Sequence, residues 1–197
     1  MLPFAQAQKA KDLVVVDSVS FKNLQKADIQ GIGGPVLRME VDIVAKASFE
    51  PKAKWLRNVE VEVMLAYEDA KSGTGYVFLK SRAKLFAAEI HKKTAVVFYV
   101  PWEAYQMYRL SGEPKAYKIT LFANGSEVKL TRDNLKDRVS SSIKSQKELD
   151  AFEKHVAEAQ SLNDGVLRPL NECPANFQRY EFIKAVTNPI PTYLNLK

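Results

Sequence analysis

The feature that most constrains this chain is a regular alternation of apolar and polar residues between positions 37 and 46. The apolar positions are Leu37, Met39, Val41, Ile43 and Ala45. The polar positions are Arg38, Glu40, Asp42 and Lys46. A period of two residues is that of a β-strand, whose side chains point alternately to opposite faces. The pattern therefore predicts a strand with its apolar face in a core and its polar face in water.

Similar patterns recur through the first two-thirds of the chain. They predict further strands over residues 13–21, 59–67, 76–91, 94–100, 117–123 and 126–131. The segment 76–91 is long enough for one long strand or two short ones. Asn124-Gly125 lies between the last two strands, and this pair favours a tight hairpin because both residues tolerate positive φ. Short strands separated by turns are typical of a two-sheet β-sandwich.

Helical spacing appears in two places. Trp102, Tyr105 and Tyr108 recur every third residue, which predicts one or two helical turns over the end of a sheet. Ser145 and Glu148 have the spacing of a capping box at the start of a helix. The apolar stripe that follows is Leu149, Phe152, Val156 and Ala159. It predicts an amphipathic helix that ends near residues 163–165, before a tail rich in proline and aromatic residues.

Length and composition are those of one folded domain with an appendage. The chain has 197 residues, of which 46% are hydrophobic and 26% are charged. A chain of this size can form a core without disulfides or metals, and its one cysteine, Cys173, has no partner for an internal disulfide. We expect a leader remnant and N-terminal arm over residues 1–12, a β-sandwich over 13–131, and a helix with an aromatic C-terminal extension over 132–197.

The N-terminus indicates export from a bacterial cytoplasm. Residues 2–8 look like the end of a signal peptide, because Ala5-Gln6-Ala7 matches the small-residue pattern that signal peptidase recognises. We therefore expect a periplasmic, outer-surface or secreted protein. No segment of the sequence reaches the ~18 consecutive apolar residues that a transmembrane helix needs.

Two aromatic residues indicate an immunoglobulin-like form of the sandwich. Trp55 lies just before the third predicted strand, where that fold places its core tryptophan, and Tyr117 opens the penultimate strand, near the position of the tyrosine corner. Ile119 stands where the second cysteine of the inter-sheet disulfide would be, so that disulfide is absent. The expected fold class is mainly β, an immunoglobulin-like two-sheet β-sandwich with a C-terminal helical extension.

The overall layout resembles a small exported immunoglobulin-like protein that mucin-degrading gut bacteria encode with type IV pilus-like genes. The resemblance covers the leader remnant, the sandwich through Leu130 and the helical tail, and it depends on this order of parts rather than on a motif. It implies an accessory or structural role at the cell envelope, with other envelope or pilus-like proteins as partners and without catalysis. It transfers no binding residue to this chain.

The sequence contains no recognisable catalytic, cofactor-binding or metal-binding constellation. A zinc site needs several clustered ligands, and the two histidines, His91 and His155, are isolated. Residues 31–35 are glycine-rich but lack the phosphate-loop signature and lead into a strand. Glu60 and Glu62 share one strand face, where alternating charge is the ordinary pattern of a wet surface. We therefore expect no enzymatic activity, no cofactor and no metal.

The leading functional hypothesis is protein–protein contact through the aromatic tail. The candidate contacts are Phe177, Tyr180, Phe182 and Tyr193. An exposed edge strand of the sandwich offers a second mode of association, by accepting a strand from a neighbour. We expect a chain without the tail from Phe177 to Tyr193 to fold as a sandwich but to bind its partner weakly.

The alternative hypothesis is a binding module for an acidic glycan or a host surface ligand. Its candidate residues are Lys52, Lys54, Trp55 and Arg57. The net charge of +6 favours peripheral contact with anionic surfaces. Lys80, Arg82 and Lys84 add a basic strand face, but acidic residues are interspersed, so we do not expect nucleic acid as the partner. Nothing in the sequence indicates an oligomeric state.

Overall fold

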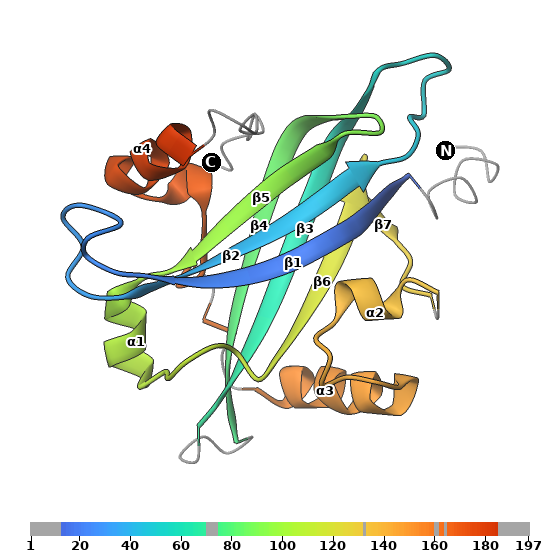
Figure 1. Cartoon of the computed structure of the whole chain (residues 1–197). Helices are drawn as coiled ribbons and strands as arrows, with labels where there is room; N and C mark the ends of the chain where they lie inside the picture. Colours follow the sequence, from blue (N-terminus) through green and yellow to red (C-terminus); the bar gives the residue numbers. More distant parts are fainter. Residues whose placement is uncertain (1–12, 70–74, 132, 160–161, 164, 185–197) are drawn as a thin grey trace.

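The computed structural model describes residues 13–69, 75–131, 133–159, 162–163 and 165–184. Two antiparallel four-stranded sheets pack face to face, and helices lie against their outer faces and at one end (Figure 1). The strand order is β1-β2-β5-β8 in sheet A and β4-β3-β6-β7 in sheet B. The prediction of a mainly β, two-sheet sandwich with a C-terminal helix is confirmed.

The strands follow the predicted segments closely. Sheet A consists of β1 (Val14–Leu24), β2 (Val36–Ala45), β5 (Lys93–Val100) and β8 (Arg168–Pro169). Sheet B consists of β4 (Tyr76–Glu89), β3 (Trp55–Glu68), β6 (Ala116–Ala123) and β7 (Ser126–Val128). β4 is one strand of 14 residues. β7 is shorter than predicted because the Asn134 side chain accepts from Thr131 N and donates to Lys129 O, which turns the chain away.

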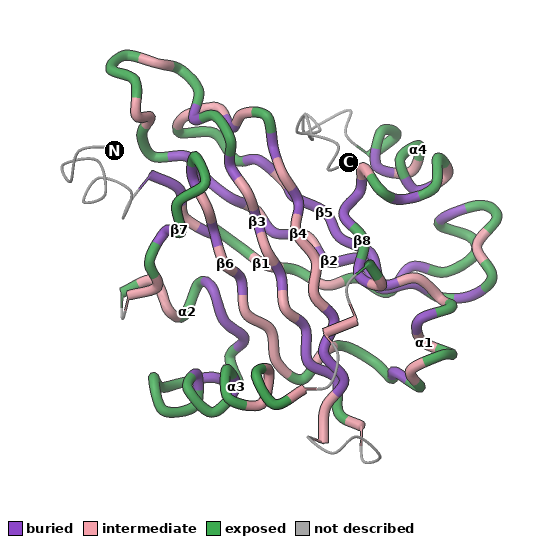
Figure 2. The backbone as a smooth tube through the Cα atoms, turned by 180° about the vertical axis from the view of Figure 1, so that it is seen from behind, coloured by how far each residue is buried: buried purple, intermediate pink, exposed green. Residues whose placement is uncertain are grey.

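The core between the sheets is formed by the predicted inward positions of the alternating pattern. The inward side chains of β2 and β3 are at most 2% exposed, namely Leu37, Met39, Val41, Ile43, Ala45, Val59, Val61, Val63, Leu65 and Tyr67. Figure 2 shows buried positions recurring along the central strands, whereas α3 and α4 carry long exposed stretches. Each fully buried aliphatic side chain contributes roughly 1.5–3 kcal/mol to folding.

The predicted hairpin and helix start are both present. Asn124 and Gly125 have φ of 50° and 76°, as a tight hairpin between β6 and β7 requires. α3 (Gln146–Glu158) begins after Ser145, whose Oγ accepts from Glu148 N at 3.3 Å. Glu148 Oε2 in turn accepts from Lys144 N at 2.5 Å, which completes the capping arrangement.

α3 ends at Glu158, earlier than the predicted residues 163–165. The backbone is already extended at Ala159, and residues 162–163 run along the outer edge of β4. There, Leu162 O accepts from Lys80 N at 3.0 Å, and Asn163 Nδ2 donates to Phe78 O at 2.9 Å. Pairing with the sheet edge therefore replaces the last helical turn.

The helices form two further layers outside the sheets. α4 (Ala175–Lys184) lies on the outer face of sheet A, where Phe177 packs against Val97 and Tyr99 in a second apolar core. α2 (Leu135–Arg138) and α3 lie against sheet B, where Phe152 packs on Phe78 in a third core. α1 (Trp102–Tyr108), predicted from its aromatic spacing, follows β5 directly.

Residues beyond 131 also belong to the sandwich itself. β8 pairs with β5 in sheet A, with Phe98 opposite Pro169 and Tyr99 opposite Arg168. Leu167, just before β8, is fully buried in the core between the sheets. A short 3-10 helix, η3 (Leu170–Glu172), then leads to α4.

Three expectations from the sequence are wrong. Arg38 was expected in water but is 6% exposed, because α4 covers its face of sheet A. Trp55 is 48% exposed and is no core tryptophan, since the inward position beside it is taken by Leu56. Tyr117 packs on Phe21, with 5.6 Å between ring centroids, and its hydroxyl bonds to no described residue, so it forms no tyrosine corner.

Within the described ranges, no helix is long and apolar enough to cross a bilayer.

Candidate functional site

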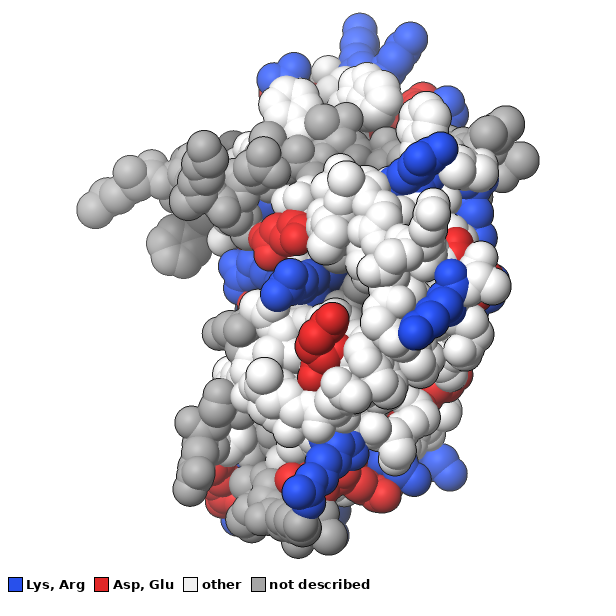
Figure 3. Space-filling view, turned by 90° about the vertical axis from the view of Figure 1, so that its left-hand side faces the viewer, with Lys and Arg blue, Asp and Glu red and all other residues white. Residues whose placement is uncertain are grey.

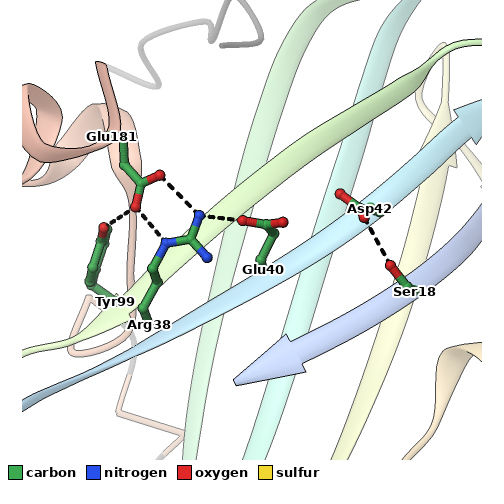
Figure 4. A network of polar contacts seen from close by, with 6 residues as sticks. All are labelled: Ser18, Arg38, Glu40, Asp42, Tyr99 and Glu181. Atoms are coloured by element: carbon green, nitrogen blue, oxygen red, sulfur yellow. Dashed lines mark hydrogen bonds and ion pairs between the residues drawn. The ribbon is translucent and has the colours of Figure 1, made fainter. Parts of the chain in front are cut away.

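A buried ion-pair network joins α4 to the outer face of sheet A (Figure 4). Arg38 of β2 donates from Nε to Glu181 Oε1 at 2.5 Å and from Nη2 to Glu181 Oε2 at 2.9 Å. Tyr99 of β5 donates its hydroxyl to the same carboxylate, and Glu40 pairs with the guanidinium from the other side. Arg38 and Glu181 are each 6% exposed. The network therefore fixes α4 on the sheet.

The network keeps its charged groups ionised. Burial alone would raise the pKa of Glu181, but hydrogen bonds from Arg38 and Tyr99 and the charge of Arg38 outweigh it, so the pKa lies below its ordinary value. Burial alone would lower the pKa of Arg38, but Glu181 and Glu40 raise it above its ordinary value. Burial and the neighbouring Glu181 raise the pKa of Tyr99, so the phenol stays neutral. We assign a structural role to these groups.

A cavity of about 380 Å³ lies beside this network, and we call it the α4 cavity. Its walls come from the loop over residues 31–36, from the start of α1 and from the segment that leads into α4. Trp102 packs against Gly33 and Gly34, so close that a Cβ at Gly34 would be 2.4 Å from Trp102 Cδ2. The glycines of this loop therefore leave the space that the indole ring of Trp102 occupies.

A second cavity, the α3 pocket, has a volume of about 400 Å³ and lies between α3 and the ends of β3, β4 and β6. Tyr76, Phe78 and Phe152 line it with aromatic rings, and His155 is half-buried beside Tyr76, with 5.9 Å between ring centroids. His155 Nδ1 is buried and has no hydrogen-bond partner in the described part of the chain.

The four predicted contact residues of the tail differ in how far their side chains are exposed. Phe177 is 6% exposed and contacts Tyr99, with 4.8 Å between ring centroids, so its prediction as a contact residue is wrong. Tyr180 is half-buried against the second core. Phe182 is 72% exposed, and its neighbour Ile183 is 64% exposed. Tyr193 lies outside the described residues.

The predicted anionic-ligand residues lie together at one end of the sandwich. Lys52, Lys54, Trp55 and Arg57 are all exposed, in the β2–β3 loop and the first residues of β3. Sequence reasoning missed Phe86 of the neighbouring β4, which is 50% exposed. Its place in the alternation with Lys80, Arg82 and Lys84 would have indicated an outward position. We call these five residues (Lys52, Lys54, Trp55, Arg57 and Phe86) the basic-aromatic end.

The basic residues predicted along β4 are engaged in ion pairs with acidic residues of β3. Arg82 pairs with Glu60 at 3.2 Å and with Glu62 at 2.6 Å. Lys80 and Lys84 each pair with one of the same two glutamates at 3.3 Å. Three cations thus share two carboxylates on the outer face of sheet B, so most of the charge there is balanced. This pairing argues against both the basic face and the glutamate pair as candidate sites.

On the side of the molecule that carries α1 and α4, the surface charge is mixed except at one end (Figure 3). Figure 3 shows the side with α1 and α4, where basic and acidic side chains are interspersed over the middle of the molecule. The upper end in that view is mainly basic. Figure 1 shows that the β2–β3 loop and the β4–β5 turn project at this end. This end contains the exposed Lys52, Lys54 and Arg57.

The described residues offer no reactive centre among their cysteine, histidine and acidic side chains. They contain no group of three or more potential metal ligands. Burial raises the pKa of the Cys173 thiol to about 12, and Cys173 Sγ donates to Pro169 O at 3.4 Å, so the thiol is protonated and packed. His91 is exposed in the turn after β4.

The fold and the surfaces together define a two-sheet antiparallel β-sandwich flanked by helices. The structure is similar to a crystal structure of a protein from Akkermansia muciniphila, with a TM-score of 0.63 and 15% sequence identity over 93% of each chain. No family model matches the sequence. No curated protein matches it either. At this identity, the likeness establishes the shared fold.

Proposed function

We propose that this chain is an exported, non-enzymatic protein of the cell envelope that acts through protein–protein contacts, as a component of a type IV pilus-like assembly. The observation that best supports this function is the surface of α4. Phe182 and Ile183 are 72% and 64% exposed, although large apolar side chains are usually buried. The opposite side of α4 is fixed to sheet A by Phe177 and Glu181. A rigid helix with exposed apolar groups is suited to docking on a partner.

The fold and the structural neighbour are consistent with this proposal. The first, second, fifth and eighth strands form one sheet, and the third, fourth, sixth and seventh form the other. The division of the first seven strands between the sheets supports an immunoglobulin-like arrangement. The neighbour comes from Akkermansia muciniphila, a mucin-degrading gut bacterium. Sandwiches of this kind commonly serve as cell-surface domains.

The test is photo-crosslinking in the living source cell, with benzoylphenylalanine in place of Phe182. A matched control has the same group in place of Met107 of α1, because both side chains are 72% exposed. We expect the probe at position 182 to capture envelope proteins at a yield several times that at position 107. Equal yields, or capture of cytoplasmic proteins by both probes, would contradict the proposal.

The second candidate function is binding of an acidic glycan at the basic-aromatic end. The supporting observation is that Trp55 and Phe86 are 48% and 50% exposed on adjacent strands, beside the exposed Lys54 and Arg57. Aromatic rings can pack on the apolar faces of sugars, while lysine and arginine pair with their carboxylate or sulfate groups.

Dextran sulfate is a suitable probe for this second function. We expect substitution of Lys52, Lys54 and Arg57 by alanine to weaken binding and to flatten its salt dependence, because ionic attraction is screened by salt. Trp55→Ala should weaken binding while leaving the salt dependence unchanged. Binding that is insensitive to both changes would exclude this end as the site.

A further inference from the structure

The α4 cavity combines apolar walls with unpaired charges of opposite sign. Val36, Tyr99 and Phe177 are buried and form its inner wall, and Trp102 is half-exposed at its side. Its volume of about 380 Å³ lies at the lower end of the range for small-molecule sites, about 300–1,000 Å³. The cavity thus has the size for a compact ligand with one or two rings.

The two charged groups come from different elements that meet at this cavity. Glu103 lies in the first turn of α1, and Arg168 lies in β8; both are exposed and line the cavity. Arg168 donates Nε to Gly165 O at 3.2 Å, which leaves its two terminal nitrogens for another acceptor. Neither group forms an ion pair within the described part of the chain.

We propose that the α4 cavity binds a small aromatic zwitterion, of the chemical class of a free aromatic amino acid. The ring lies against Trp102 and the inner apolar wall, where stacking and burial stabilise it. The guanidinium of Arg168 pairs with the ligand carboxylate in the geometry that planar forks favour. The carboxylate of Glu103 pairs with the ligand ammonium group. This activity is separate from the contacts proposed for the exposed residues of α4.

Opposite charges in the lining of one cavity are the observation that selects this class. An aromatic acid would meet Arg168 favourably but would also meet the negative charge of Glu103, and an aromatic amine would face the reverse mismatch. Only a ligand with both charges satisfies both groups while its ring fills the apolar space. Three other polar donors of the lining are already engaged: the Tyr99 hydroxyl donates to Glu181, the Asn176 amide nitrogen to Gln30 O and the Cys173 thiol to Pro169 O.

The test compares three ligands that share the indole ring, namely L-tryptophan, tryptamine without the carboxylate, and indole-3-propionate without the ammonium group. Calorimetric titration and ligand-observed NMR on the full chain measure each affinity. We expect L-tryptophan to bind most tightly. Loss of one charge-assisted hydrogen-bond pair should weaken binding about tenfold or more.

Two substitutions of exposed side chains separate the two contacts. Arg168→Gln should weaken L-tryptophan and indole-3-propionate about tenfold but leave tryptamine unchanged. Glu103→Gln should weaken L-tryptophan and tryptamine but leave indole-3-propionate unchanged. The matched controls are Arg109→Gln and Glu50→Gln, which make the same charge changes at exposed positions outside the cavity lining.

Either of two results would overturn the proposal. One is the absence of saturable binding of L-tryptophan to the intact chain. The other is binding of all three ligands that neither Arg168→Gln nor Glu103→Gln alters, which would indicate unspecific uptake of an apolar ring. The photo-crosslinking result at position 182 is independent of both, so the two proposals can fail separately.

Discussion

At the scale of single residues, Gly34 is fixed by its contact with Trp102. A Cβ at this position would lie 2.4 Å from Trp102 Cδ2 and 2.7 Å from Cε2, closer than atoms approach without displacement. We expect Gly34→Ala to lower the free energy of unfolding by about 1–3 kcal/mol, because the added methyl overpacks the site. Urea denaturation followed by circular dichroism measures the change.

The double variant with Trp102→Ala tests whether the indole is the cause. In that background the ring is gone, so Gly34→Ala should cost only a few tenths of a kcal/mol, as substitutions without a steric conflict do. An equal cost with and without the indole would show that the backbone of the loop, rather than Trp102, requires glycine.

Glu181 makes stability depend on pH in the acid range. Its pKa in the folded chain lies below the ordinary value, which is about 4.3 in an unfolded chain. Its contribution is therefore fully present above about pH 4.3 and is lost as the pH falls through the lower, folded pKa. Glu181→Gln should cost roughly 3 kcal/mol at pH 7, because the substitution leaves Arg38 buried with only Glu40.

The measurement is the unfolding free energy of both proteins between pH 2 and pH 7. The difference between them should shrink towards acid pH. The control is Glu153→Gln, which removes the partner of Lys118 from a 47% exposed side chain and should cost at most ~1 kcal/mol. A cost at Glu181 that stays constant across the range would refute the ionic contribution.

At the scale of elements, β8 and α4 are parts of the folded core. Leu167 is buried between the sheets, and Phe177 is buried between α4 and sheet A. We therefore no longer expect the sandwich to stay folded when the tail is removed. We expect a chain that ends at residue 166 to lose its cooperative thermal transition, because it exposes one side of two apolar cores.

A chain that ends at residue 184 is the matched control, since it keeps β8 and α4. It should keep a cooperative transition in the same circular dichroism experiment, because both apolar cores remain complete. If the shorter chain ending at residue 166 melted equally well, then the contacts of Leu167 and Phe177 would contribute little to stability.

The strands could be predicted from the sequence because their signal is local. Alternation within β2 and β3 specifies which side chains face the core, and Asn124-Gly125 specifies the turn after β6. The position of α4 on the outer face of sheet A could not be predicted in this way. Arg38 is polar and alternates correctly, so only its contact with Glu181, which lies 143 residues further along the chain, reveals that this face is covered.

The candidate sites were predictable to a smaller extent. Exposed Lys52, Lys54 and Arg57 could be read from a polar loop. The exposure of Trp55 depends on Leu56 taking the inward position, which its neighbours in sequence do not decide. The α4 cavity is lined by α1 and β8, which are far apart in the sequence. Contact between such distant elements leaves no periodic pattern in the sequence of either one.

At the scale of the whole molecule, the three apolar cores share the same two sheets. The first lies between the sheets, the second between sheet A and α4, and the third between sheet B and α3. Because loss of either sheet exposes two cores at once, we expect one cooperative thermal transition. Differential scanning calorimetry should give equal calorimetric and van't Hoff enthalpies. Two resolved transitions would show that the helical layers unfold independently.

The short segment after α3 has a consequence for self-association. Leu162 and Asn163 occupy hydrogen-bonding groups of Phe78 and Lys80 along the outer edge of β4, a strand of 14 residues. An uncovered edge of that length would offer a template on which extended chains stack into fibrils. Two residues that form neither helix nor strand thus block part of the longest edge of sheet B, and they lower the tendency of the native protein to polymerise.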